Sequence, residues 1–152
     1  MSDLAYFEDV VVGETRRFGS YRVTAEEIVE FARQFDPQPF HLDEEAARPT
    51  MFGGLIASGW HTAAMLIRMV ADHAIPGTAS AGALGFDDLQ WRVPVRPGDV
   101  LSVESVIRER AVSRRRSDRG TVKIEWRVLN QRDEVVMSLV SLVIYRRRPP
   151  PP

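Results

Sequence analysis

Apolar residues at helical spacing predict a first helix over the stretch AEEIVEFARQF. Thr24 begins it, because Thr24 and Glu27 have the spacing of a capping box. Pro37 requires the helix to end at Asp36, since the residue before a proline disfavours helical geometry. The apolar stripe of this helix consists of Ile28, Phe31, Ala32 and Phe35.

The stretch SGWHTAAMLIRMVADHAIPG predicts the longest helix of the chain. Pro76 and Gly77 end it. Its apolar face is wide, which implies that another layer of structure wraps around the helix. The apolar positions at helical spacing are Trp60, Ala63, Ala64, Ile67, Val70, Ala71 and Ala74.

The rest of the chain alternates between strand-like segments and turns. Segments rich in Val, Leu, Ile and Trp lie near residues 82–93, 100–112, 120–130 and 135–147, and a further strand ends at Val23. The turn sequences PVRPGD, SRRRSD and NQRDE separate the later strands. This order of elements predicts an α+β domain in which an antiparallel β-sheet curls around the long central helix.

The stretch FDPQPFHLD places Asp36 five positions before His41, with two prolines between them. Each proline favours extended geometry in the residue before it, so we expect a loop here and not a helix. Asp43 then begins a short helix, EEAAR, as its N-cap. A carboxylate and an imidazole on a stiffened loop can form an acid–base pair. The alternative is a helix-end aspartate beside a packed or solvated histidine.

Composition restricts the class of protein. A chain of 152 residues, 44% hydrophobic and 27% charged, predicts one globular domain, which we place at residues 1–147 before a disordered proline-rich tail at 148–152. The lack of cysteine excludes disulfides and thiolate-bound metal, and we expect no metal site. We find no signal peptide and no apolar run long enough to cross a membrane. We therefore expect a cytoplasmic protein without a membrane partner.

Charge is unevenly distributed along the chain. Residues 1–99 carry 8 basic and 15 acidic residues, whereas residues 100–152 carry 12 basic and 6 acidic ones. Two arginine clusters, SRRRSDRG and YRRRPPPP, supply much of the basic excess, and we interpret them as a solvated turn and a solvated chain end. No zinc-finger, P-loop or RNA-binding motif accompanies them, so we expect no nucleic-acid partner.

Three stretches, taken in order, resemble one known family. DPQPFHLD, FGGLIASGWHTAAM and LQWRVPVRPGD are similar to the signature of the MaoC-like dehydratases, the (R)-specific enoyl-CoA hydratases of the hotdog fold. That signature is roughly D-x-N-P-[LIV]-H-x-D, F-x-x-x-I-A-x-G-M and F-x-x-P-V-x-x-G-D. The resemblance runs from the first helix to the last strand and implies a single hotdog domain.

The resemblance assigns three roles. Asp36 and His41 match the catalytic aspartate and histidine, and Gly59 matches the glycine whose backbone N–H holds the thioester oxygen. It implies reversible hydration of an enoyl-CoA, in which Asp36 and His41 activate water and protonate the α-carbon. Coenzyme A is part of that substrate, so no separate cofactor is expected. A hotdog thioesterase and a non-catalytic subunit of a heteromeric dehydratase stay open as alternatives, as does an acyl carrier protein in place of coenzyme A.

Three neighbouring positions depart from the family pattern. Gln38 replaces the usual Asn, Ser58 replaces a His, and Trp60 replaces a Met. We expect these residues to bind the substrate or shape its pocket. For Trp60 two interpretations stay open: it reshapes the acyl pocket, or it only packs in the core.

The resemblance also implies partners. The family pairs two hotdog domains around an acyl tunnel, so we expect a homodimer or an assembly of dimers. Arg92, Arg96 and Arg114–Arg116 are candidates for binding coenzyme A phosphates, with plain surface charge as the alternative. His61 is interpreted as a packed or interface residue, or as one pointing toward the site, and His73 as part of the last turn of the central helix.

Overall fold

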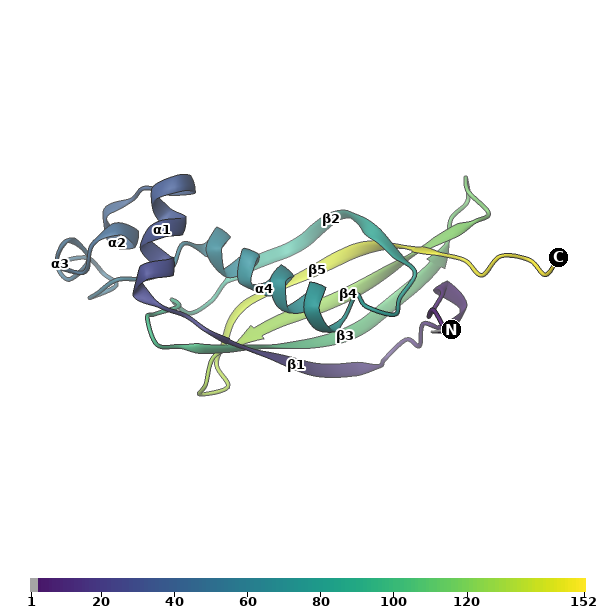
Figure 1. Ribbon diagram of the computed structural model, residues 1–152, viewed down its shortest axis with the longest axis horizontal. Coiled ribbons are helices and arrows are strands. Elements are labelled where there is room, and N and C mark those ends of the chain that lie inside the picture. Colours follow the sequence, from purple (N-terminus) through teal and green to yellow (C-terminus); the bar gives the residue numbers. More distant parts are fainter. Residues whose placement is uncertain (1–2) are drawn as a thin grey trace.

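The computed structural model describes residues 3–152, which form one antiparallel five-stranded sheet with a long helix against it (Figure 1). The strand order is β1-β3-β4-β5-β2, so β1 and β2 are the two edges. This arrangement confirms the predicted α+β class and the sheet around a central helix. The strands are β1 (Thr15–Arg22), β2 (Ser80–Trp91), β3 (Val100–Val112), β4 (Arg119–Leu129) and β5 (Val135–Arg146).

The sheet curves around the helix through irregularities in its register. Pairing shifts between Phe18 and Tyr21 on β1, and again at several points along β2. Such bulges increase twist and bend the strands. At Gly19 the first of these bends brings β1 against the helix, where a β-carbon would lie 2.6 Å from Sδ of Met69. At this point β1 packs directly against the helix.

The central helix, α4 (Gly59–His73), buries a different face from the one that the sequence predicts. Of the predicted set, Trp60 is 59% and Ile67 is 55% exposed, and only Val70 is buried. The helix is apolar on more than one side, so hydropathy alone does not identify the side that meets the sheet. The side chains that it buries are His61, Thr62, Met65, Leu66, Met69 and Val70.

Three shorter helices lie together beside the N-terminal end of α4: α1 (Ala25–Phe35), α2 (Pro39–Leu42) and α3 (Glu44–Ala47) (Figure 1). The hydroxyl oxygen of Thr24 accepts the N–H of Glu27 at 3.2 Å, so Thr24 caps α1 as predicted. The carboxylate of Glu27 does not complete the capping box; it contacts two other residues instead. The apolar stripe of α1 is also narrower than expected, because Phe35 is 69% exposed.

The expectation that FDPQPFHLD is entirely loop is wrong. Residues Pro39–Leu42 form the single turn α2, with Pro39 at its first position. Proline is tolerated there, because the first N–H of a helix has no intrahelical acceptor in any case. Asp43 then caps α3 as predicted, accepting the N–H of Glu45 at 2.7 Å. The turn carries His41 inward, and its side chain is buried.

No helix within residues 3–152 is long and apolar enough to span a bilayer.

Candidate active site

Asp36 and His41 come together where α1 ends and α2 begins. Nε2 of His41 lies 3.3 Å from Oδ2 of Asp36. Asp36 is the C-cap of α1, and its N–H donates to the carbonyl oxygen of Ala32 at 2.9 Å. The end of one helix and the single turn of the next therefore hold the two side chains that the sequence selected.

The imidazole of His41 has a defined orientation. Its Nδ1 lies 2.8 Å from the carbonyl oxygen of Ile56. A carbonyl oxygen only accepts, so Nδ1 carries the hydrogen, and the neutral ring has a bare Nε2. That bare nitrogen faces Asp36. The neutral ring can therefore accept a proton at Nε2, and the imidazolium so formed donates from Nε2 to the carboxylate of Asp36.

Two donors hold the carboxylate of Asp36. The hydroxyl of Ser58 donates to Oδ2 at 2.7 Å, and the amide of Gln38 donates to Oδ1 at 2.6 Å. Burial raises the pKa of Asp36, but these two hydrogen bonds and the positive charge of His41 in its protonated form together lower it by more, and its pKa lies below the ordinary aspartate value. Asp36 is therefore an ionised acceptor at neutral pH.

Gly59 is the first residue of α4, and Ser58 is its N-cap. The side chain of Ser58 makes no capping hydrogen bond to the helix, since its hydroxyl donates to Asp36. The first N–H groups of a helix lack intrahelical acceptors and carry partial positive charge. The N-terminus of α4 therefore lies directly after Ser58, whose hydroxyl contacts the carboxylate of Asp36.

Trp91, at the end of β2, is a member of this site that the sequence did not identify. Its indole N–H donates to the carbonyl oxygen of Gly59 at 2.9 Å. A β-carbon at Gly59 would lie 2.3 Å from Cε2 of Trp91. Position 59 is glycine because the indole occupies that space. The third motif could have identified this residue, because the family pattern has Phe at the position where this chain has Trp91.

Trp60 does not pack in the core, so that interpretation is wrong. It is 59% exposed and contacts Trp91 edge to face, with ring centroids 5.1 Å apart. The pair stands at the start of α4 beside Gly59. An exposed aromatic pair next to the candidate reacting groups is available to contact a ligand.

The arginines proposed for phosphate binding are dispersed. Arg92 donates to the hydroxyl of Ser138 at 2.9 Å, and Arg96 donates to the carbonyl oxygen of Phe52. Arg114–Arg116 lie in the turn between β3 and β4, at the opposite end of the sheet from α1–α3 (Figure 1). Within one chain, that cluster is far from Asp36 and His41.

Together these groups can transfer protons and stabilise negative charge. An oriented imidazole with one bare nitrogen beside an ionised carboxylate is an acid–base pair. A helix N-terminus next to it can stabilise an oxyanion. Within residues 3–152, no group of three or more His, Asp or Glu side chains is arranged to hold a metal ion.

Comparison with known proteins identifies the family of this chain. Residues 9–128 match the family model described as MaoC like domain. The chain belongs to the MaoC-like family. This MaoC-like chain is 38% identical over 114 residues to the 3-hydroxybutyryl-CoA dehydratase of Methylorubrum extorquens, covering 74% of this chain and 69% of the relative.

Two solved structures show the same fold over nearly the whole MaoC-like chain. The MaoC-like dehydratase from Rhodospirillum rubrum is 44% identical, with a TM-score of 0.88, covering 95% of this chain and 99% of that one. The R-hydratase PhaJ1 from Pseudomonas aeruginosa is 25% identical, with a TM-score of 0.76, covering 98% and 95%. These similarities confirm both the family and the hotdog fold expected from the sequence.

Proposed function

We propose that this protein catalyses the reversible addition of water to an enoyl thioester of coenzyme A, giving a 3-hydroxyacyl thioester. The contact of the Asp36 carboxylate with an imidazole whose other nitrogen is fixed by Ile56 supports this function best. The family supplies the reaction class, since relatives of this chain are named as a dehydratase of 3-hydroxybutyryl-CoA and as an R-hydratase.

In the proposed hydration, water attacks the β-carbon of the enoyl group and gives up a proton to the bare Nε2 of His41. The carbon–carbon π electrons shift toward the thioester, and the N–H of Gly59 stabilises the resulting enolate oxygen. The ionised Asp36 stabilises the imidazolium beside it. The pair then returns a proton to the α-carbon, so hydroxyl and hydrogen are both added to the substrate. Dehydration is the same sequence in reverse.

Two alternative functions predict different results in the same assay. A hotdog thioesterase would release the free thiol of coenzyme A, and a non-catalytic subunit would do neither reaction alone. We expect the protein to remove the enoyl absorbance of crotonyl-CoA without releasing thiol, measured in parallel with a thiol reagent. Thiol release at the same rate as absorbance loss would support a thioesterase, and inactivity on crotonyl-CoA and its longer homologues would overturn the proposal. Enoyl thioesters of pantetheine and of an acyl carrier protein, tested beside them, would show which carrier is accepted.

We also propose that two copies pair through the exposed apolar surface around β2. Strand β2 is an edge of the sheet, and its Leu84 and Phe86 are each 63% exposed. The exposed side of α4 adds the apolar side chains of Trp60 and Ile67. Unpaired edges and large apolar surfaces are normally covered. A second copy of the chain would cover both and enclose the acyl group at the interface.

Light scattering at micromolar concentration should therefore give at least twice the 17.2 kDa of one chain. Phe86→Glu should convert the assembly to monomers, because it places a charge in the apolar contact. Val112→Glu is the matched control, since Val112 is 51% exposed on β3 and lies outside that surface. A stable monomer in the unmodified protein would contradict the pairing.

A further inference from the structure

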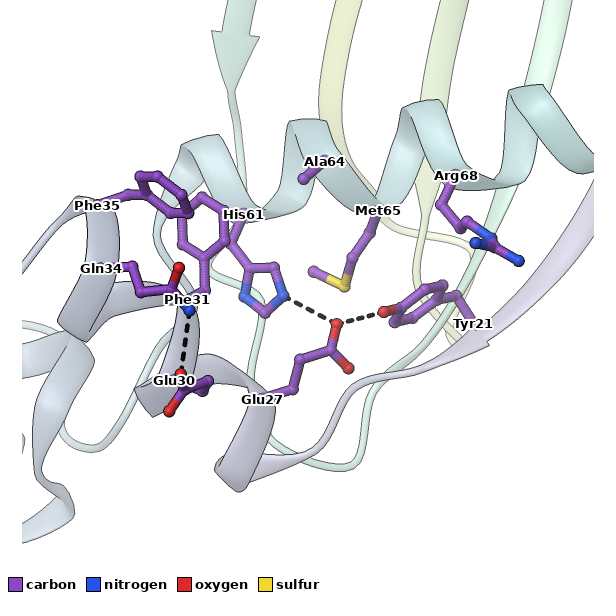
Figure 2. Close-up of a pocket in the computed structure, with 10 residues that line it drawn as sticks. All are labelled: Tyr21, Glu27, Glu30, Phe31, Gln34, Phe35, His61, Ala64, Met65 and Arg68. Atoms are coloured by element: carbon purple, nitrogen blue, oxygen red, sulfur yellow. Dashed lines mark hydrogen bonds and ion pairs between the residues drawn. The ribbon is translucent and has the colours of Figure 1, made fainter.

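A hydrogen-bonded cluster of Tyr21, Glu27 and His61 lies next to the candidate active site and has no role in the reaction proposed above. Oε1 of Glu27 accepts a hydrogen bond from the hydroxyl of Tyr21, and Nε2 of His61 lies 3.1 Å from the same Oε1 (Figure 2). Burial and the bond to Glu27 raise the pKa of Tyr21 to about 12, so its hydroxyl stays protonated and donates. Two donors thus converge on one carboxylate oxygen.

His61 is held tightly within this cluster. The residue is 2% exposed, and its ring stacks on Phe31 with centroids 4.7 Å apart and planes 8° apart. A pocket of about 370 Å³ opens beside it between α1 and α4 (Figure 2). Ring face and ring edge are therefore both fixed, the face by Phe31 and the edge by Glu27.

The other ring nitrogen of His61 is unusual. Nδ1 is buried and has no hydrogen-bond partner within the described part of the chain. With Nε2–H donating to Glu27, Nδ1 of the neutral ring is a bare acceptor. A buried polar atom without a partner costs free energy, so an apolar side chain would pack here at less cost. The polar cluster is therefore not explained by stability alone.

The cluster joins the elements that carry the two halves of the site. Glu27 is in the first turn of α1, the helix that ends at Asp36. His61 is two residues after Gly59, at the start of α4. Tyr21 adds β1, which is fixed in the sheet by its pairing with β3. The Glu27–His61 bond thus ties the helix that presents the carboxylate to the helix that begins with the candidate oxyanion donor.

We infer that the Tyr21–Glu27–His61 cluster is a positioning group that holds the Asp36–His41 pair at its working distance from the N-terminus of α4. The inference rests on the proposed hydratase function. Small displacements of reacting groups have large kinetic effects, because the groups must already be aligned when the substrate binds. Within residues 3–152 the three side chains make no hydrogen bond to Asp36 or His41, so the cluster acts through the placement of the two helices.

His61→Leu tests the inference on the full-length protein. We expect kcat for crotonyl-CoA hydration to fall by about 10- to 100-fold while KM changes by less than about twofold, since alignment is lost and the exposed Trp60–Trp91 pair is unchanged. Glu27→Gln should keep kcat within about threefold of the unmodified protein, because the amide oxygen of Gln still accepts both donors. Rescue by this conservative change distinguishes positioning by hydrogen bonds from a need for charge.

Val122→Ala is the control for lost stability. Val122 is fully buried on β4 and has no part in the cluster. It should lower the melting temperature and leave kcat unchanged below that temperature. If His61→Leu lowers the melting temperature as Val122→Ala does but keeps kcat within about threefold, the cluster is only structural and the inference is overturned.

Amide hydrogen exchange gives a readout that does not need activity. The N–H of Asp36 donates to the carbonyl oxygen of Ala32, and the N–H of His41 donates to that of Gln38. In His61→Leu both amides should exchange about tenfold faster than in Val122→Ala, because the end of α1 and the turn α2 are released. Unchanged exchange would overturn the inference. A protein that hydrates no enoyl thioester but shows this release would instead refute the proposed function and keep the positioning role.

Discussion

Asp36→Asn should reduce kcat/KM for hydration of crotonyl-CoA by roughly a thousandfold, the middle of the range for loss of an acid–base group. The substitution keeps the size of the side chain but removes the charge that stabilises the imidazolium of His41, which lies 3.3 Å away. His41→Ala should cost a similar factor, and the double variant little more, because the two residues act as a unit.

The pH dependence follows from the lowered pKa of Asp36. A carboxylate whose pKa lies below its ordinary value of about 4 is ionised throughout the range from about pH 5 to 8. We therefore expect no loss of activity in that range from protonation of Asp36. An acid limb of kcat/KM that lies between pH 5 and 8 in the unmodified protein and disappears in Asp36→Asn would contradict this assignment.

Asp43→Asn is the matched control for Asp36→Asn. It makes the same chemical change seven residues further along the same stretch. Asp43 caps α3 through the N–H groups of Glu45 and Ala46, and asparagine caps helices about as well as aspartate. This variant should keep full activity. Retained activity in Asp36→Asn would overturn the role of Asp36, and equal losses in both variants would point to general damage to the segment.

Gly59→Ala should have the second largest effect, a loss of activity of about a hundredfold or more, comparable to removing an oxyanion donor. The new β-carbon would lie 2.3 Å from Cε2 and 2.6 Å from Nε1 of Trp91. Either the indole or the first turn of α4 must move, and each movement breaks the bond from Trp91 to the carbonyl oxygen of Gly59. Overpacking of this kind costs about 1–3 kcal/mol of stability.

Two further variants separate the local effect of Gly59→Ala from destabilisation. In Gly120→Ala a β-carbon would lie 2.4 Å from Cε2 of Phe7, so the crowding is similar but occurs at the start of β4. The turn that precedes β4 lies at the opposite end of the sheet from α1–α3 (Figure 1). Gly120→Ala should lower the melting temperature and leave kcat unchanged. Trp91→Ala removes the indole that the new methyl group meets, so the double variant Gly59→Ala/Trp91→Ala should be more active than the two single losses predict. Strict additivity of the two losses would show that the steric conflict is not the cause.

Prediction from the sequence worked best where local chemistry decides. Thr24 and Asp43 cap the helices that they were expected to cap, and Pro37 marks the end of α1 at Asp36. It worked less well where neighbours in space decide. Glu27 has the spacing of a capping-box partner, yet its carboxylate contacts Tyr21, six residues earlier, and His61, 34 residues later. The local sequence around Glu27 does not indicate either contact.

The candidate site shows the same division. Asp36 and His41 were found from the order and spacing of residue types, and the structure brings them into contact. Trp91 was missed because its partner is the carbonyl oxygen of Gly59, 32 residues earlier in the chain. A contact between a strand end and a helix start leaves no local pattern in either stretch.

The resemblance to the family selected Asp36 and His41 as the candidate acid–base pair. The sequence by itself determined the α+β class and the approximate bounds of the strands. These depend on the spacing of apolar residues and on turn and cap chemistry, which act between residues close along the chain. Only the tertiary structure decided that α4 turns Met65 and Met69 inward and leaves Trp60 and Ile67 exposed. The reason is physical: α4 is apolar on more than one side, and only packing against a curved sheet selects the side that is buried.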